Sequence, residues 1–123
     1  EYACRAGTTT HYSFGDDPGQ LEKHGWFRLK SGSNPVRRVG SKPANSFGLF
    51  DMHGNLFEWC HDMRVHQQSG KSLPVSAARV LRGGDWFGNA LRCRSAFRGF
   101  GAQNTRSDDV GFRVMRPLSS EEE

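Results

Sequence analysis

Long apolar stretches are missing from this sequence. No run approaches the ~20 residues needed to span a bilayer, and no basic segment followed by an apolar one opens the chain. We therefore expect no membrane segment, and the sequence carries no signal that assigns a localisation. Residues 1–6 begin without a Met or a helix cap, so we expect a fragment that starts inside a structural element.

Cysteine is scarce, and neither sign of charge dominates. The three cysteines, Cys4, Cys60 and Cys93, are far apart, odd in number and not arranged as C-x-x-C. They establish neither a disulfide framework nor a zinc site. Lys and Arg total 17 against 13 Asp and Glu, a net charge of +4 that is scattered along the chain. A basic stripe with interleaved aromatics is absent, so the sequence does not favour nucleic-acid binding.

What is present indicates one loop-rich domain. The chain of 123 residues has 35% hydrophobic residues and 15 Gly, with nine Phe and three Trp to fill a single core. Turn residues and short periodic runs predict the end of a helix at 1–6 and a short helix at 21–26. The same signals predict strands at 11–14, 79–82, 93–97 and 110–115. The expected loops are 30–45, 61–78 and 98–109.

The stretch from 45 to 60, N-S-F-G-L-F-D-M-H-G-N-L-F-E-W-C, is the densest in signals. Gly54 and Asn55 tolerate positive φ, so they predict a sharp corner between two apolar segments. Asp51 before the corner and Glu58 after it are acceptor-only carboxylates, and backbone carbonyls of the turn can join them. Oxygen ligands of this kind suit a hard cation such as Ca²⁺. The alternative is that both carboxylates only cap the turn through backbone N–H groups.

The chain resembles the formylglycine-generating enzyme, or sulfatase-modifying factor, family. The blocks that carry the resemblance occur in the family's order and cover nearly the whole chain: E-Y-A-C-R-A-G-T, Y-S-F-G-D-D, the 45–59 block, R-V-L-R-G-G, C-R-S-A-F-R and D-V-G-F-R-V. The resemblance implies an α+β fold of the C-type-lectin-like kind, with a small twisted antiparallel sheet, few helices and much irregular loop. It also implies a domain at 1–118 that lacks the family's N-terminal portion, followed by an acidic tail at 119–123.

The resemblance implies a structural calcium site in the 45–60 block. The family's ligands correspond to the side chains of Asp51 and Glu58 and to the carbonyls of Gly54 and Leu56. All four positions offer oxygen ligands here.

The family's copper site is incomplete in this sequence. The oxidase binds Cu(I) through two cysteines five positions apart, and thiolates are the soft ligands that Cu(I) prefers. The second position is Cys93, but the first is Gly88. Cys93 is therefore a doubtful catalytic residue. Copper- and O₂-dependent formation of formylglycine from a sulfatase cysteine remains as the alternative function, together with another metal-dependent oxidation of the same family.

Ligand binding accounts better for these departures. Residues 85–109 resemble the variable region of lectin-fold proteins that retroelements diversify, which are relatives of this family. The expected contact residues are Asp85, Phe87, Gly88, Asn89, Arg92, Phe97, Gly99, Phe100, Gly101 and Ala102. Their aromatic and guanidinium groups are typical of binding hot spots, so we expect a protein or small-molecule ligand at this surface. The alternative is an ordinary loop in a homologue that is not diversified.

Overall fold

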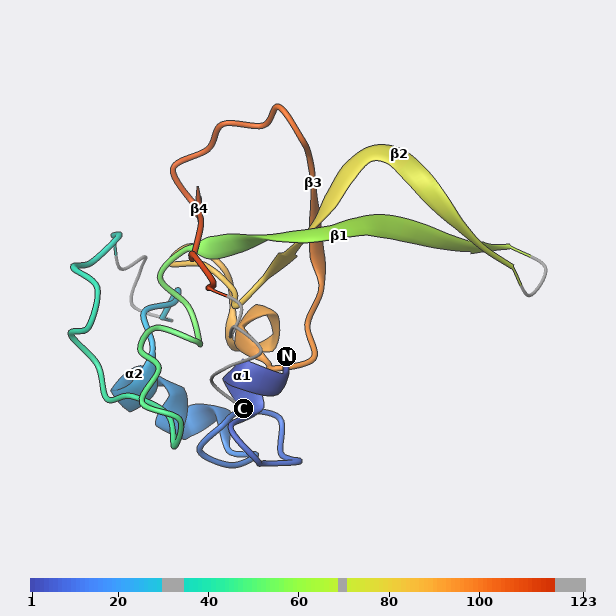
Figure 1. The fold of residues 1–123 in the computed structure, drawn as a ribbon. Coiled ribbons are helices and arrows are strands. Elements are labelled where there is room, and N and C mark those ends of the chain that lie inside the picture. Colours follow the sequence, from blue (N-terminus) through green and yellow to red (C-terminus); the bar gives the residue numbers. More distant parts are fainter. Residues whose placement is uncertain (30–34, 69–70, 117–123) are drawn as a thin grey trace.

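The computed structural model describes residues 1–29, 35–68 and 71–116, with side chains described outside residues 64–77. A long two-stranded hairpin projects from a body of short helices and loops (Figure 1). The helices are α1 (Tyr2–Arg5), the 3₁₀ helix η1 (Pro18–Gln20), α2 (Leu21–His24) and the 3₁₀ helix η2 (Ala90–Cys93). The strands are β1 (Phe57–Gln68), β2 (Lys71–Arg82), β3 (Gly99–Ala102) and β4 (Val110–Gly111). Among the described helices, none has the length and hydropathy required to cross a membrane.

The four strands form one sheet in the order β3-β2-β1-β4. β1 pairs antiparallel with β2, with Trp59 opposite Leu81, and β2 pairs antiparallel with β3. β4 pairs parallel with β1, so the predicted antiparallel sheet is a mixed one. The register of the hairpin shifts on both sides of Met63, as at β-bulges. A small sheet with few helices and long loops confirms the predicted α+β class.

Two regions differ from the predicted secondary structure after the corner. Residues 61–78 were expected to be an irregular loop, but 61–68 belong to β1 and 71–78 to β2. The predicted strand at 93–97 is wrong, because the Asn89 side chain accepts a hydrogen bond from the Arg92 N–H and starts η2 instead. The strand lies further on, at β3, inside the predicted 98–109 loop. There Gly99 and Gly101 let the backbone approach Leu81 and Trp59, and a Cβ at Gly101 would lie 2.9 Å from the Trp59 ring.

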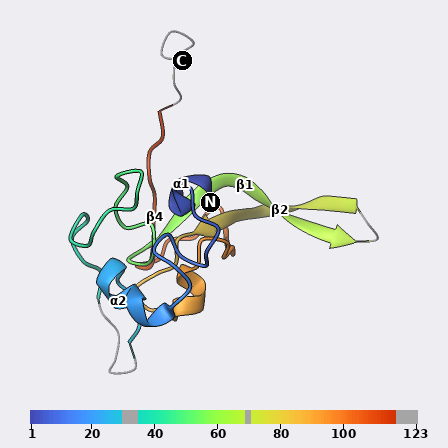
Figure 2. The same cartoon turned by 90° about the horizontal axis from the view of Figure 1, so that it is seen from below.

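Two further strand predictions differ from the structure: the one at 110–115 is right only in part, and the one at 11–14 is wrong. The alternating pattern at 110–115 predicted a full strand, but only Val110 and Gly111 pair with β1. Beyond them the chain runs away from the sheet (Figure 2), with Phe112 and Val114 more than three quarters exposed, at 80% and 84%. The expected strand at 11–14 is a tight turn in which Tyr12 and Gly15 exchange backbone hydrogen bonds. The two predicted helices are confirmed as α1 and α2.

A small apolar core joins the N-terminal half of the chain to η2. It consists of Tyr12, Leu21, Phe27 and Cys93. The Tyr12 hydroxyl donates to the Ala90 carbonyl at 2.8 Å, so the ring is buried with its polar group satisfied. The core thus packs against the start of η2, where Ala90 contacts it.

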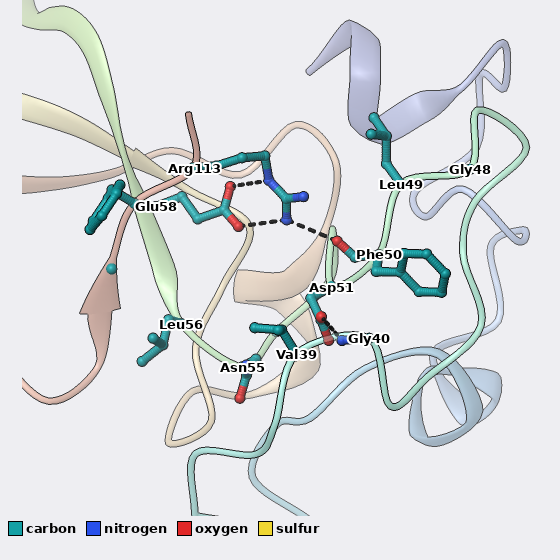
Figure 3. A pocket seen from close by; sticks show the side chains of 13 residues that line it. Val39, Gly40, Gly48, Leu49, Phe50, Asp51, Asn55, Leu56, Glu58 and Arg113 are labelled. Atoms are coloured by element: carbon teal, nitrogen blue, oxygen red, sulfur yellow. Dashed lines mark hydrogen bonds and ion pairs between the residues drawn. The ribbon is translucent and has the colours of Figure 1, made fainter. Parts of the chain in front are cut away.

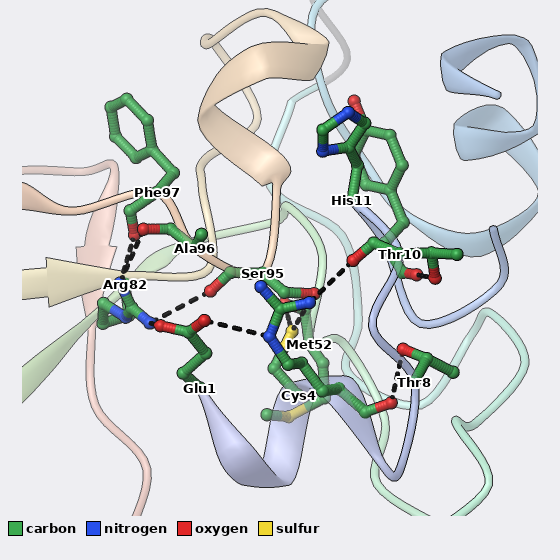
Figure 4. A network of polar contacts seen from close by, with 12 residues as sticks. Glu1, Cys4, Thr8, Thr10, His11, Met52, Arg82, Ser95, Ala96 and Phe97 are labelled. Carbon is green, nitrogen blue, oxygen red and sulfur yellow. Dashed lines mark hydrogen bonds and ion pairs between the residues drawn. The ribbon is translucent and has the colours of Figure 1, made fainter. Parts of the chain in front are cut away.

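Arg82, at the end of β2, links three segments (Figure 4). Its guanidinium donates to the carbonyls of Ser95, Ala96 and Phe97 at 3.0, 3.0 and 2.8 Å. It also pairs with the Glu1 carboxylate at 2.7 Å, next to α1. Because these carbonyls bond to Arg82 rather than to a neighbouring strand, residues 95–97 follow an irregular path.

Candidate functional site

The corner at Gly54 and Asn55 has the predicted backbone conformation. The two residues have φ of +88° and +70°, and Asp51 before them has φ of +56°. The chain crosses residues 25–26 at this point with almost no space between the two backbones. A Cβ at Gly54 would lie 2.3 Å from the Trp26 carbonyl oxygen, and a Cβ at Gly25 would lie 1.9 Å from that of His53. The crossing therefore requires glycine at both positions.

Asn55 connects this corner to three other segments. Its N–H donates to the Trp26 carbonyl at 2.7 Å, and its carbonyl accepts from the Trp86 N–H at 2.9 Å. Its side-chain amide bonds both the N–H and the carbonyl of Arg37, at 2.9 and 3.2 Å. In addition, the Gly54 N–H donates to the Gly83 carbonyl at 2.7 Å. The corner thus fixes the start of the 85–92 loop through backbone hydrogen bonds.

His53 lies buried behind the corner, and its hydrogen bonds define its tautomer. Nδ1 lies 2.8 Å from the Cys93 carbonyl, which only accepts, so Nδ1 carries the proton. Nε2 then accepts from the Ser13 N–H at 3.1 Å and faces the Ser13 hydroxyl at 2.9 Å. Burial lowers the pKa of His53. The ring is a neutral structural bridge between the 11–15 turn and η2, with the Cys4 thiol 3.8 Å from Nε2.

A pocket of about 430 Å³ lies beside the corner and is lined by all four predicted calcium positions, Asp51, Gly54, Leu56 and Glu58 (Figure 3). Asp51 is 9% exposed, and its Oδ2 accepts from the Gly40 N–H at 2.7 Å. Its Oδ1 is buried and has no hydrogen-bond partner among the described residues. A buried carboxylate oxygen without a partner is costly unless a cation or a donor satisfies it.

Glu58 has a partner that the sequence did not indicate. Arg113 binds its two carboxylate oxygens at 2.9 and 2.7 Å and also donates to the Phe50 carbonyl at 2.8 Å (Figure 3). The hydrogen bonds with Glu58 raise the pKa of Arg113. A carboxylate has about four lone-pair sites, and Arg113 takes two of them. Glu58 therefore keeps acceptor capacity, and its remaining lone pairs and the Asp51 Oδ1 are hard oxygen ligands of the kind that a calcium ion would take.

Within the described residues, no group of three or more His, Cys, Asp and Glu is arranged to hold a metal ion. The calcium positions depend on carbonyls as well as carboxylates.

The copper position does not fit a copper ion. Cys93 is 0% exposed, and burial raises the pKa of its thiol to about 12, with smaller contributions from Asp85 and Cys4. A thiolate ligand would have to form in an environment that opposes the charge. At Gly88, a Cβ would lie 2.3 Å from Asp85 Oδ1 and 2.8 Å from Arg92 Cδ, so the place of the second thiol is filled.

Asp85 is a buried carboxylate beneath the 85–92 loop. It is 1% exposed, and the backbone N–H groups of Phe87 and Gly88 face its carboxylate without reaching good hydrogen-bond geometry. Burial raises its pKa, and the nearby Asp109 raises it further, while Arg92 opposes the rise. Asp85 supports the loop from below rather than presenting its carboxylate to solvent.

The structure separates the predicted ligand residues by exposure. Phe87, Asn89, Arg92, Phe100 and Ala102 are exposed, Phe97, Gly99 and Gly101 are half-buried, and Asp85 and Gly88 are buried. Phe100 and Ala102 lie on β3, and Phe97 packs against Phe57 with ring centroids 6.2 Å apart. The remaining exposed residues lie on the 85–92 loop, which brings Phe87, Asn89 and Arg92 together.

Arg28 contacts the 85–92 loop, although the sequence did not indicate it as a site residue. Its N–H donates to the Gly88 carbonyl at 2.9 Å, and its guanidinium lies 5.3 Å from the Phe87 ring centroid. Trp86 meets Phe87 edge-on, with centroids 5.6 Å apart. Nothing in the spacing of residues 26–29 indicated this long-range contact, because it depends on the chain crossing at Gly25 and Gly54.

Comparisons with known proteins identify the family. The model of the sulfatase-modifying factor enzyme 1-like domain matches residues 1–118. The chain is 33% identical to the formylglycine-generating enzyme of Mycobacterium tuberculosis over 150 residues, covering 97% of this chain and 49% of the relative. It is 30% identical to the chaperone protein LppX of Paenibacillus barcinonensis over 91 residues, covering 74% of this chain and 31% of the relative.

Among solved structures, Treponema denticola variable protein 1 matches with a TM-score of 0.78 at 33% identity. The match covers 90% of this chain and 42% of that one. The chain thus spans less than half the length of these proteins. It belongs to the sulfatase-modifying factor enzyme 1-like family.

Proposed function

We propose that this family member is a ligand-binding domain whose contact surface is the 85–92 loop and whose corner is braced by calcium. The main support for this proposal is Phe87, a large apolar side chain that is 52% exposed. Its ring is held between Trp86 and the Arg28 guanidinium. Exposed aromatic and Arg side chains with fixed positions are typical of binding hot spots, and the likeness to Treponema denticola variable protein 1 supports the proposal.

The 85–92 loop is suited to recognition because it is rigid at both ends. The Trp86 N–H bonds the Asn55 carbonyl, and the Gly88 carbonyl bonds the Arg28 N–H, both at 2.9 Å. At the far end, η2 begins at the Asn89 cap. A loop ordered before binding loses less conformational entropy when a ligand arrives. Phe87 and Asn89 can then contribute contact area and hydrogen bonds at little further cost.

Oxidation of a substrate cysteine has less support from the geometry. Cys93 is fully buried, Gly88 supplies no thiol, and Asp85 fills the space where one would stand. The resemblance to the formylglycine-generating enzyme of Mycobacterium tuberculosis is the reason to test this activity directly. Cu(I) titration and mass spectrometry of a sulfatase-derived cysteine peptide provide that test. We expect no stoichiometric Cu(I) binding at Cys93 and no formylglycine.

A panel of immobilised glycans and peptides tests ligand binding. Replacing Phe87 by Ala removes the exposed ring without touching the core, and Phe112→Ala is a matched control that removes a ring exposed by 80% outside the loop. We expect Phe87→Ala to weaken the affinity for the ligands that the parent chain binds by at least about tenfold, the scale of a hot-spot truncation. Phe112→Ala should leave these affinities unchanged. Equal effects of both variants, or formylglycine production, would overturn the proposal.

The calcium brace is tested by stability rather than by ligand binding. Asp51 and Glu58 would hold the ion with the carbonyls of Gly54 and Leu56, and the ion would neutralise the unpaired Asp51 Oδ1. Calcium at 100 times its dissociation constant stabilises the folded state by about 2.7 kcal/mol. We expect calcium to raise the melting temperature of the parent chain and chelator to reverse the rise. Asp51→Asn should abolish this response. Asp62→Asn makes the same change at an exposed position on β1 and should retain the response.

A further inference from the structure

Two arginine side chains lie beside the neighbouring residues Phe87 and Gly88. Arg28 comes from the segment after α2, and its guanidinium lies 5.3 Å from the ring centroid. Arg92 comes from η2, and its Cδ would lie 2.8 Å from a Cβ at Gly88, so its side chain passes over Gly88. Both arginines are exposed. Phe87 and Gly88 therefore form a strip that both arginine side chains contact.

Among the described residues, neither arginine forms an ion pair within 4.0 Å, although Arg92 interacts electrostatically with the buried Asp85. In the part of the chain that the structure describes, the ion pairs within 4.0 Å involve Arg5, Arg82 and Arg113. Arg28 and Arg92 are absent from them. Asp85 lies beneath the strip and is 1% exposed, and the charge of Arg92 opposes the rise of its pKa. Solvent at this strip thus meets positive charge beside an aromatic face.

We infer that the strip binds an anionic oxo group, a carboxylate, sulfate or phosphate, carried on an apolar ring that packs against Phe87. A guanidinium presents several N–H donors in a planar fork that matches such oxygens. The ring of the ligand supplies the apolar contact, as in other aromatic recognition sites. This inference names the ligand class of the surface under the proposed function and rests on it.

The assignment to an anion follows from the balance of charge. A cationic ligand would also favour an aromatic face, but Arg28 already occupies the neighbourhood of the Phe87 ring. A second cation there would meet repulsion from Arg28 and Arg92. An anion would instead be attracted by both guanidiniums.

NMR titration of the intact chain with small probes tests the inference. Phenyl phosphate, phenyl sulfate and benzoate carry the three anionic groups on the same ring, while phenol carries no charge and inorganic phosphate no ring. We expect at least one of the ring-bearing anions to shift the Nε–Hε signals of Arg28 and Arg92 and the ring signals of Phe87. Phenol and inorganic phosphate should each bind at least about fivefold more weakly. The relative affinities of the three anions identify the preferred group.

Charge-neutral variants separate a site from a general basic surface. Arg28→Gln and Arg92→Gln should each weaken the binding of the preferred anion by about fivefold, the scale of one exposed charge pair. Arg38→Gln makes the same change of net charge at an exposed position elsewhere and should leave the affinity within about twofold. Equal weakening by Arg38→Gln would overturn the inference, because it would show an unspecific charge effect.

The failure of this inference differs from the failure of the proposed function. Phenol binding as tightly as the anions, or no probe binding at all, would overturn the anion site. Both results would leave the glycan and peptide panel, with its dependence on Phe87, as an independent measure of ligand binding.

Discussion

The crossing of residues 25–26 with 53–54 predicts that three Gly→Ala variants will differ sharply in stability. Gly7, Gly25 and Gly54 separate the two reasons why glycine can be needed. Gly7 has φ of +90° and no atom within 4 Å of a Cβ, so it carries only the cost of positive φ. Gly25 has an extended backbone but a Cβ clash at 1.9 Å with the His53 carbonyl. Gly54 has both, with φ of +88° and a clash at 2.3 Å.

The expected magnitudes follow from these contacts. Positive φ costs an alanine roughly 1–2 kcal/mol, so Gly7→Ala should lower the free energy of unfolding by about 1 kcal/mol. At Gly25 the two backbones must separate, which strains the hydrogen bonds of Asn55 to Trp26 and of Gly54 to Gly83, both 2.7 Å long. Each is worth about 1 kcal/mol, and lost packing adds a similar amount. We expect about 3 kcal/mol for Gly25→Ala and about 4 kcal/mol for Gly54→Ala, where both costs apply.

Urea denaturation followed by circular dichroism measures these differences. A domain of this size has a total stability of roughly 5–15 kcal/mol, so the two crossing variants should show much lower midpoints, or fail to fold, while Gly7→Ala remains folded. The m-value should stay constant among the folded variants. The reasoning is refuted if Gly25→Ala is as stable as the parent chain, or if Gly54→Ala and Gly7→Ala differ by less than about 0.5 kcal/mol, a gap too small for a backbone clash.

Two buried or half-buried side chains give further predictions. The pKa of His53 is lowered in the folded state, so its contribution to stability is present above the unfolded pKa of about 6.5 and is lost as the pH falls below it. His53→Gln should reduce the loss of stability between pH 7 and pH 5, whereas the same change at exposed His11 should not; equal pH profiles for both would contradict the role of His53. Arg82→Met removes four hydrogen bonds and should lower the free energy of unfolding, measured by urea denaturation, by about 3 kcal/mol. The control Arg38→Met, on the surface, should lower it by less than about 0.5 kcal/mol. A cost for Arg82→Met no larger than this control would show that the carbonyls of residues 95–97 are satisfied by solvent.

The sequence predicted local geometry better than pairing. Gly54 and Asn55 indicated a positive-φ corner because the preference belongs to the residues themselves, and the structure confirms it. The alternation at 110–115 predicted a longer strand than β4, since a strand also needs a partner and β1 offers one only at Phe57 and Glu58. The side-chain pattern contains no information on where a neighbouring edge ends.

The site shows the same division. Asp51 was predicted as a calcium ligand from its position before the corner, and in the structure it lines the pocket with a buried oxygen that has no partner among the described residues. Arg113 and Arg28 were missed as partners, because each acts on a residue far away in the sequence, Glu58 and Phe87 respectively. Such contacts depend on the crossing of the chain, which no local spacing encodes. The pairing of β1 with β2 was missed for a related reason, because the register of two strands is a relation between segments that a local pattern does not contain.

The corner and the ligand surface share a backbone connection, which predicts that calcium and ligand binding are coupled. The Trp86 N–H donates to the Asn55 carbonyl at 2.9 Å. Asn55 lies four residues after Asp51 and three before Glu58, between the two carboxylates of the proposed calcium site. An ion held by Asp51 and the Gly54 carbonyl would order Asn55 and, through it, the start of the 85–92 loop. Coupling of this kind is reciprocal, so each ligand changes the affinity for the other by the same factor.

The coupling is measured as the affinity of the preferred anionic probe with calcium and with chelator. We expect calcium to tighten binding by about fivefold, the lower end of typical coupling energies, and the probe to tighten calcium binding equally. Asp51→Asn should remove the difference while leaving the affinity measured in chelator unchanged, because Asp51 does not belong to the ligand surface. A calcium effect that persists in Asp51→Asn would place the ion elsewhere, and calcium binding without any effect on the probe would show that the Asn55 to Trp86 hydrogen bond does not transmit order to the loop.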